Sequence, residues 1–387
     1  MADTDRSVDY VVVGLGALGS ATAWHLAARG HTVVGIEQFE LGHTRGASHD
    51  TSRILRHSYH TPAYVRLTQE AYADWADLER ESGQSLVTRT GGLDLFPPDP
   101  AIPSIDYTQS MDEVGIGYEA LDADQVTARW PQLRLPAGTL ALYQPDAAIV
   151  PAGRTTAVLQ DEARRLGAEL RDHAPVLHLE DLGDRLRVST ADGDVECSGV
   201  VVTADAWVND VVGHLGLQIP VEVTLEQVTY FGLDRPGELS DLPLWIWMDD
   251  PSFYGFPPYG ERTVKAAQDC GGPVVDPDDR TSDLDLAMEA LLAEHVRAIL
   301  PAVGAPVRSV RCQYTLTPDR DFVLAPVPGH ERVVVGLGAA HAFKFVPTFG
   351  RVLADLATTG TTRSDVSAFR LDRPALTEPG YAAHWLV

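Results

Sequence analysis

The sequence predicts an α/β fold in which a parallel sheet covered by helices forms one domain and a mainly antiparallel sheet, inserted in two pieces, forms a second. The chain opens with a strand, a glycine turn, a helix and a second strand; it closes with another strand, glycine turn and helix; and strand-like runs containing Pro and Gly lie between them. A length of 387 residues suffices for two domains. We expect the parallel-sheet domain to hold residues 1–87, 146–220 and 315–387, and the inserted domain to hold residues 88–145 and 221–314.

The opening element is the clearest. Residues 9–13 form the continuous apolar run of a buried parallel strand, and GLGALG, a helical pattern and a strand ending at Glu37 follow. In such a unit Gly14 makes the tight turn, Gly16 lets backbone N–H groups approach a pyrophosphate, and Gly19 permits close packing of helix on strand. Glu37 would accept the ribose hydroxyls, and an acid there argues against the 2′-phosphate of NADP. The spacing therefore predicts a dinucleotide site.

The segment after Glu37 departs from the usual pattern, because a polar stretch replaces the short crossover to a third strand. A long helical pattern through Tyr72 and Trp75 follows it. Such a loop beside a nucleotide suits flavin proteins better than nicotinamide dehydrogenases. Further along, residues 186–207 indicate a hairpin and then a strand over residues 199–203 that returns to the first domain.

The C-terminal part repeats the sequence of strand, glycine turn and helix over residues 331–360. The helical face carries four large apolar residues, Phe345, Phe349, Val352 and Leu356. Gly360 is placed to end that helix. We find no internal repeat or low-complexity tract.

Composition limits the partners. The formal net charge is −25, with 55 acidic against 30 Lys and Arg residues, which repels nucleic acid and anionic membranes. No apolar run approaches the roughly 18 residues that span a bilayer, and the N-terminal MADTDRSVDY has no signal core, so we expect a cytoplasmic protein. The three cysteines, Cys197, Cys270 and Cys312, lack the number and spacing of a disulfide framework or a metal site.

Lysine is almost absent. Only Lys265 and Lys344 are lysine, and every other basic residue is arginine. A chain that uses arginine nearly everywhere is expected to keep lysine where a compact ammonium with a movable pKa is needed. Both lie in apolar or glycine-containing contexts, although the alternative of leftover surface lysines is open at this point.

With these elements in place the whole chain resembles the monomeric sarcosine oxidase and N-methyltryptophan oxidase family of D-amino acid oxidase-like flavoproteins. The resemblance rests on GLGALG, on TSRILRH at residues 51–57, on FYGFP followed by Lys265, on RCQYT at residues 311–315, and on HAFKF at residues 341–345. It implies a discontinuous FAD-binding domain of the glutathione-reductase type with a sheet-based substrate domain. It also implies a monomer that oxidises a secondary or N-methyl amino acid to an imine while O2 becomes hydrogen peroxide.

The resemblance implies a covalent flavin. A cysteine at the position of Cys312 carries the flavin of the family through a thioether, and Arg311 beside it could help to hold the thiol as thiolate. Taken alone, a single cysteine at a strand end is more often an inert small hydrophobe. Cys197 and Cys270 have no such context and are interpreted as structural.

The resemblance implies a separate role for each of four charged residues. Arg53 matches an arginine against the flavin, and Arg56 one that pairs with the substrate carboxylate in bidentate fashion, where the alternative for each is a surface ion pair. Lys344 matches the second carboxylate ligand, and the helix that follows should face the flavin with its N-terminus. Lys265 matches a lysine that activates O2.

The remaining site residues are expected from the same match. Tyr254 and Tyr314 match pocket aromatics, although plain core is the commoner place for an aromatic in an apolar strand. His341 matches a histidine near the flavin, and a hydrogen-bonded structural histidine is equally open. The predicted cofactor contacts are Gly14, Gly16, Gly19, Glu37, Ser52, Arg53, Cys312, Gly338 and Lys344, and the predicted catalytic residues are Lys265, Arg53, His341 and Tyr314. No dedicated general base is expected, because the nitrogen lone pair drives the transfer of the hydride equivalent.

Two departures from the family bear on the substrate. Asp269 stands where relatives usually have a pocket histidine, and Trp245 and Trp247 replace smaller residues on one face of a strand. If that face lines the pocket, sarcosine should be a poor substrate and a cyclic or aromatic amine a better one, while Asp269 could favour a second positive group. Otherwise the indoles face the core and Asp269 reaches solvent. Rival functions are oxidation of a cyclic amino acid or heterocyclic intermediate (proline, pipecolate or piperideine carboxylate type) and a flavin-binding sensor without turnover.

Overall fold

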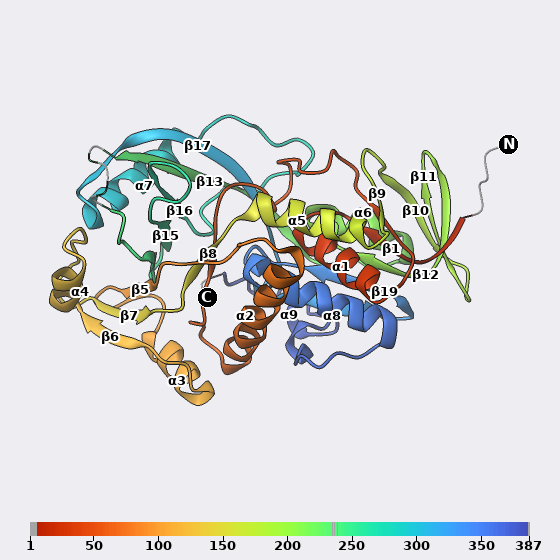
Figure 1. The fold of residues 1–387 in the computed structure, drawn as a ribbon, viewed down its shortest axis with the longest axis horizontal. Coiled ribbons are helices and arrows are strands. Elements are labelled where there is room, and N and C mark those ends of the chain that lie inside the picture. The colour runs from red at the N-terminus through yellow and green to blue at the C-terminus, as the bar shows by residue number, and fades with distance from the viewer. Residues whose placement is uncertain (1–5, 234, 236, 238, 386–387) are drawn as a thin grey trace.

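A computed structural model describes residues 6–233, 235, 237 and 239–385. Over this part the chain forms two eight-stranded sheets and one three-stranded sheet. Figure 1 shows the two large sheets at opposite ends of an elongated molecule. None of the helices in these residues is long and apolar enough to cross a membrane.

The first large sheet is built around parallel strands. β1 (Arg6–Val13) pairs in parallel with β2 (Val33–Ile36) and with β12 (Gly193–Val202), as the buried apolar run predicts. The other strands are β9 (Glu169–Arg171), β10 (Val176–Asp181), β11 (Leu186–Thr190), β18 (Val323–Val327) and β19 (His330–Leu337). α1 (Ala17–Ala28) packs against α5 (Ala152–Arg165) and α8 (Val346–Thr359) beside this sheet (Figure 1).

One sequence expectation for this sheet is corrected. The hairpin expected within residues 186–207 is formed by β11 and β12, but the returning strand expected over residues 199–203 is not a separate element, because β12 is one continuous strand. Its first half pairs antiparallel with β11, and its second half pairs in parallel with β19 along the same edge. Both halves pair in parallel with β1. A local pattern shows where a strand begins, whereas the partners along its edges are set by distant segments.

The helices predicted after the polar segment and near the C-terminus are confirmed. α2 (Pro62–Ser82) contains Tyr72 and Trp75, begins after Thr61, whose side chain accepts from the Tyr64 amide, and ends at Gly83 with φ +68°. α8 buries Phe349, Val352 and Leu356 of the four apolar residues expected on its inner face and ends at Gly360 with φ +71°; the fourth, Phe345, is buried in the 3-10 turn just before it. The short sheet beside α2 consists of β3 (Arg53–Leu55), β4 (Thr88–Arg89) and β8 (Ala148–Val150).

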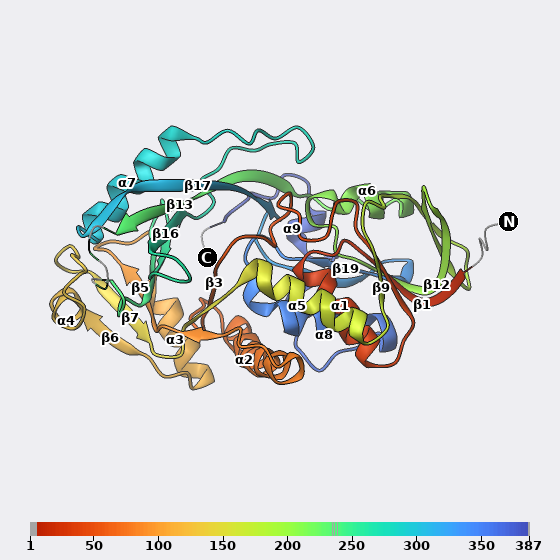
Figure 2. The ribbon, with the colours of Figure 1, turned by 45° about the horizontal axis from the view of Figure 1, so that its top comes forward.

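The second large sheet is antiparallel except where β14 pairs in parallel with β5. Its strands, in spatial order, are β17 (Val303–Leu316), β13 (Glu222–Leu233), β16 (Thr263–Gln268), β15 (Phe253–Phe256), β14 (Leu244–Trp247), β5 (Gly92–Phe96), β7 (Leu140–Gln144) and β6 (Glu119–Asp122). Figure 2 shows α7 (Leu286–Ile299) lying over β17 and β13. The shorter α-helices are α3 (Ser104–Val114), α4 (Ala123–Arg129), α6 (Val208–Val212) and α9 (Pro374–Thr377). We retain the two-domain division as a proposal.

Candidate active site

A cavity of about 580 Å³ is lined by residues of both large sheets and of the loops between them. Of the residues predicted for the site, its wall contains Gly14, Gly16, Glu37, Arg53, Arg56, Tyr254, Asp269, Cys312, Tyr314, Gly338, His341 and Lys344. Five others, all in the described part of the chain, lie outside this wall: Gly19, Ser52, Trp245, Trp247 and Lys265. The fold thus gathers at one cavity residues that are more than 300 positions apart in the sequence.

The glycine turn has the predicted geometry. Gly14 adopts φ +88°, and a Cβ at Gly19 would lie 1.8 Å from the Gly14 carbonyl oxygen, so only glycine allows α1 to approach β1 this closely. Glu37 is buried and accepts hydrogen bonds from the backbone N–H of Leu15 at 2.8 Å and of Phe39 at 3.1 Å. Burial favours the neutral acid, but hydrogen bonds from His43 and these amides outweigh it and lower the pKa of Glu37.

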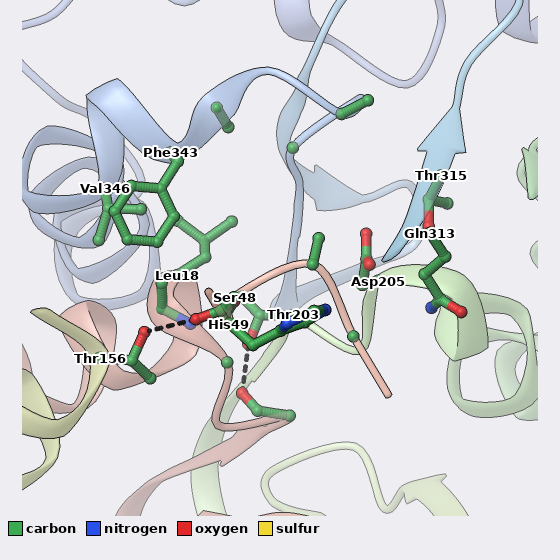
Figure 3. Close-up of a pocket in the computed structure, with 18 of the residues that line it drawn as sticks. Leu18, Ser48, His49, Thr156, Thr203, Asp205, Gln313, Thr315, Phe343 and Val346 are labelled. Carbon is green, nitrogen blue, oxygen red and sulfur yellow. Dashed lines mark hydrogen bonds between the residues drawn. The ribbon is translucent and has the colours of Figure 1, made fainter. Parts of the chain in front are cut away.

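Several buried polar atoms in the cavity wall have no partner among the described residues. They include Nε2 of His49, Oδ2 of Asp205 and both amide atoms of Gln313. Figure 3 shows His49 near Ser48 and Thr203, which come from two separate segments, and Asp205 and Gln313 further along the wall. Asp205 has φ +47°, and burial raises the pKa of its carboxyl to about 6. Because buried polar groups are nearly always hydrogen-bonded, this set fits a bound molecule with both donors and acceptors. Sequence reasoning missed these residues, because no motif marks them.

Cys312 lies on β17 in the cavity wall and is 6% exposed. Burial raises the pKa of its thiol to about 11, and the cations that oppose this shift are Arg53 and Lys265. Arg311 does not serve this purpose, because neighbouring residues on a strand face opposite sides, and it donates instead to Gln227 and to the carbonyl of Leu225. The expectation that Arg311 helps to hold the thiolate is therefore wrong.

Lys265 is a buried lysine of β16, so the alternative of a surface lysine is wrong. Its Nζ lies 2.7 Å from Oδ2 of Asp50 and donates to the carbonyl of Ser52 at 2.9 Å. Burial and Arg53 lower its pKa to about 8, although Asp50 acts in the opposite direction. Asp50, which has φ +78° and accepts from the Tyr230 hydroxyl, lies in the cavity wall, whereas Lys265 does not. Nothing in the sequence pattern singled out Asp50.

Arg53 forms hydrogen bonds within the polar loop, and Arg56 links the segment after β3 to the second large sheet. Arg53 donates to the carbonyls of Ala47 and His49 at 3.0 and 2.9 Å. Arg56 is buried and forms an ion pair with Asp94 of β5. Neither is a surface ion pair, so that alternative is wrong for both arginines. The charge of Arg56 is already matched by a carboxylate of the chain.

Lys344 differs from Arg56 in having no acidic partner. Its Nζ donates to the carbonyl of His341 at 2.9 Å, and among the described residues no carboxylate lies within ion-pair distance of it. Burial lowers the pKa of Lys344 well below its usual value, and Arg56 and Arg320 act in the same direction. The cavity wall thus contains a buried amino group whose charged form lacks a counter-ion.

His341 is a hydrogen-bonded histidine that also lines the cavity. Its Nε2 lies 2.9 Å from the carbonyl oxygen of Arg320, which can only accept, so Nε2 carries the proton and Nδ1 accepts from the Tyr59 hydroxyl at 3.2 Å. Burial, with Arg320 and Lys344, lowers its pKa well below the usual value and keeps it neutral. Tyr254 and Tyr314 are in the wall as predicted, and burial raises the pKa of both phenols.

Trp245 and Trp247 share one face of β14, as alternation predicts, but that face packs beneath α7. Trp245 is 0% exposed, and the ring centroid of Trp247 lies 5.2 Å from that of His295. Ile246, between them, is the residue in the cavity wall. The prediction that the indoles line the pocket is wrong, because alternation fixes which residues share a face and not what that face meets. The two indoles therefore give no support for an enlarged pocket.

Asp269 does not reach solvent freely, since it forms an ion pair with Arg320 at 2.8 Å within the cavity wall. Its charge is therefore already matched, and the expectation that it favours a second positive group on the substrate loses its basis. Sequence reasoning missed Arg320, because the two partners are brought together only by the contact of β16 with the loop after β17.

Comparisons with known proteins identify the family of this chain. Residues 9–356 match the family described as FAD dependent oxidoreductase. The chain is 35% identical to the monomeric sarcosine oxidase of Streptomyces avermitilis, over 93% of this chain and 96% of that protein. It is 31% identical to the peroxisomal sarcosine oxidase of Homo sapiens, over 94% of this chain and 96% of that protein.

The similarity extends to solved structures. The open form of NikD, described as an unusual amino acid oxidase essential for nikkomycin biosynthesis, matches with a TM-score of 0.85 and 30% identity, over 94% of this chain and 97% of that chain. The L-proline dehydrogenase of P. horikoshii matches in fold with a TM-score of 0.83 at 20% identity, over 95% of this chain and 97% of that chain.

Proposed function

We propose that this chain, which belongs to the FAD dependent oxidoreductase family, oxidises a secondary or N-methyl amino acid at its C–N bond. The observation that carries the proposal is Lys344, a buried amino group in the cavity wall that has no carboxylate partner among the described residues. An amino acid carboxylate is the charge that this position lacks. The relatives named as sarcosine oxidases support the same class of substrate.

The cavity fits FAD. The turn at Gly14 and Gly16 exposes backbone at the start of α1, Glu37 stands at the end of β2, and unpartnered polar atoms of His49, Asp205 and Gln313 lie nearby. Such a set can meet the phosphates, ribose and ribityl hydroxyls of a dinucleotide. FAD, when bound, supplies the two-electron acceptor, and the protein supplies binding, orientation and charge.

The substrate would be held by its carboxylate. Lys344 provides the charge, and Arg56 adds N–H donors while staying paired with Asp94. The phenols of Tyr254 and Tyr314 would form apolar and hydrogen-bonding walls beside it. Both ring nitrogens of His341 are already engaged, which supports a reaction without a dedicated base. The neutral amine is then the reactive form.

We propose further that the flavin is held covalently by Cys312. Support comes from its thiol, which lies in the cavity wall beside Arg53 and Lys265. A thioether would form with loss of the thiol proton and one methyl hydrogen, the two electrons passing finally to O2. After acid denaturation and filtration, the wild type and Cys270→Ala should retain the yellow colour, whereas Cys312→Ala should release it. Free passage of colour from the wild type would show that the linkage does not form.

We propose that the enzyme is monomeric and cytoplasmic. We propose further that its electron acceptor is O2, which is reduced to hydrogen peroxide. Support for the acceptor comes from Lys265, a buried ammonium held by Asp50 and by the Ser52 carbonyl. A fixed cation of this kind stabilises developing negative charge on oxygen. Measuring peroxide formed per substrate oxidised tests this directly, and a yield far below one to one would assign another acceptor.

The reaction is tested by anaerobic bleaching of the bound flavin. Sarcosine, N-methyltryptophan, proline, pipecolate and a piperideine carboxylate are compared, each beside its amide. We expect at least one free amino acid to bleach the flavin and its amide to fail, because the amide lacks the charge that Lys344 requires. Equal bleaching by acid and amide would contradict the carboxylate anchor. Bleaching by none would favour the sensor alternative.

A further inference from the structure

Asp269 and Arg320 form a second charged pair in the cavity wall, apart from the expected carboxylate clamp. Nη1 of Arg320 lies 2.8 Å from one carboxylate oxygen of Asp269, and Nη2 donates to the other at 2.8 Å. The Arg320 side chain is 3% exposed and that of Asp269 is 19% exposed. This two-pronged arrangement is the geometry in which guanidinium groups bind carboxylates most strongly.

The pair is held from several directions. The Asp269 amide donates to the carbonyl of Ser252 at 2.9 Å, which fixes the backbone after β16. Nη1 of Arg320 also donates to the carbonyl of Trp385, while its own carbonyl accepts from His341. Contacts within the chain therefore hold Arg320 at the cavity, and Asp269 occupies the edge of its guanidinium group that could bind another carboxylate.

The pair also acts on Lys344. Arg320 lowers the pKa of this lysine, whereas Asp269 acts to raise it. Without the Asp269 charge, this end of the cavity would hold Lys344 and Arg320 as two cations without an acid, because Arg56 is matched by Asp94. With Asp269 present, Arg56 and Arg320 each have an ion-paired carboxylate, whereas Lys344 has none among the described residues, which matches a substrate carrying one carboxylate.

We propose that Asp269 is a specificity residue that occupies Arg320 and so excludes amino acids with a second carboxylate. The inference rests on the proposed function and deepens it: the substrate class is a secondary or N-methyl amino acid with a single carboxylate. A dicarboxylic analogue would have to place its second anion beside Asp269, and like charges in a desolvated site repel strongly. Specificity here comes from a built-in repulsive element as much as from attraction.

The test is a change of charge at constant shape. Asp269→Asn keeps the size of the side chain but leaves Arg320 without an anion. The probes are sarcosine and iminodiacetate, which differ only by a carboxylate added to the N-methyl group, with N-methylaspartate and N-methylglutamate to vary the position of the second anion. Binding is read from the absorbance of the bound flavin and from the shift in Tm on adding each probe.

We expect Asp269→Asn to bind at least one of the three diacids about tenfold more tightly than the wild type does, with a smaller change for sarcosine. The same diacid should raise the Tm of the variant more than that of the wild type, because a ligand stabilises the state it binds. A purely structural role for the pair would not produce this selective gain. The double variant Asp269→Asn with Arg320→Gln is the matched control and should lose it.

The outcomes separate the two proposals. If sarcosine and simple monocarboxylates bind the wild type but no diacid gains affinity in Asp269→Asn, the inference is overturned and the proposed function stands. A gain that persists in the double variant also overturns it. If no carboxylate binds the wild type, the proposed function fails first. Should Asp269→Asn not fold, Asp269→Thr replaces it, since its smaller neutral side chain also leaves Arg320 without an anion.

Discussion

The two ends of the cavity are built in different ways. At the glycine turn the wall is made mainly of backbone, and its key contacts lie within one β-α-β unit, such as that between Leu15 and Glu37. At the other end the wall is made of charged side chains whose partners come from distant segments, as in the pairs Arg56–Asp94 and Arg320–Asp269. The first end depends on shape and the second on matched charge.

This difference predicts how each end fails. A backbone site tolerates no added atom where two segments touch, as at Gly19. A site of buried ion pairs is less sensitive to a change in shape than to the loss of one charge. Removing one partner leaves the other desolvated and unpaired. Lys344 is the exception at the charged end, since its partner is expected to be the substrate.

The largest effect is expected at the glycine turn. A Cβ at Gly19 would lie 1.8 Å from the Gly14 carbonyl oxygen and 2.5 Å from the Thr203 hydroxyl, so α1 would have to move away from β1. Gly19→Ala should lower the free energy of unfolding by about 3 kcal/mol or more and abolish FAD binding. The control is Gly117→Ala, where an added Cβ meets nothing within 4 Å. Denaturant unfolding measures both, and equal stabilities would contradict the close packing.

Variants of the Lys265–Asp50 pair should show that the free energy of unfolding depends on matched charge in the second sheet's end of the cavity. Lys265→Met leaves the Asp50 carboxylate buried without its ammonium, at a cost of about 3–5 kcal/mol in the free energy of unfolding. The double variant with Asp50→Asn should recover most of that stability, because no charge is left unmatched.

The same pair of variants separates stability from oxygen chemistry. Flavin reoxidation should be slowed by about 100-fold or more in both the single and the double variant, since neither contains the ammonium. Reduction by the substrate should change much less. Rapid mixing of reduced enzyme with O2 measures this, and equal losses in both half-reactions would assign Lys265 a structural role only.

Arg56 and Lys344 offer the sharpest contrast within the charged end. Arg56→Ala should cost both stability and carboxylate affinity, because Asp94 loses its partner. Lys344→Met should cost affinity, about 2–5 kcal/mol for a simple carboxylate inhibitor, with little loss of stability. Burial already disfavours the charged lysine. Thermal unfolding and inhibitor titration of the two variants test this, and a large stability loss in Lys344→Met would reveal a chain partner for the lysine.

The smallest effect is a pH dependence. The pKa of Lys344 is lowered well below its usual value in the free protein, and a bound carboxylate would raise it. Between these two values binding takes up a proton, so affinity should fall by up to about tenfold for each unit that the pH rises. Acetate is the suitable ligand because it has no amine that titrates. Lys344→Met should flatten the profile, and an unchanged slope in that variant would assign the proton elsewhere.

The sequence predicted the elements of this protein better than their contacts. The strand and glycine turn at Gly14, the helix through Tyr72 and Trp75 and the final helix before Gly360 were all predicted, because local spacing and capping determine them. The sequence also predicted that Lys265 and Lys344 are not leftover surface lysines, and both are buried with lowered pKa values. The face of β14 that carries Trp245 was assigned wrongly, because alternation does not say which side a helix will cover.

What the sequence by itself determined was the class of fold and the family, since both depend on short motifs whose geometry is set within a few residues. Only the tertiary structure decided which charges are matched: Asp50 with Lys265, Asp94 with Arg56 and Asp269 with Arg320. These pairs join segments that come together only when the second sheet packs on the first. Whether a buried charge acts on a ligand or is neutralised by the chain depends on that packing, because its partner can lie anywhere in the sequence.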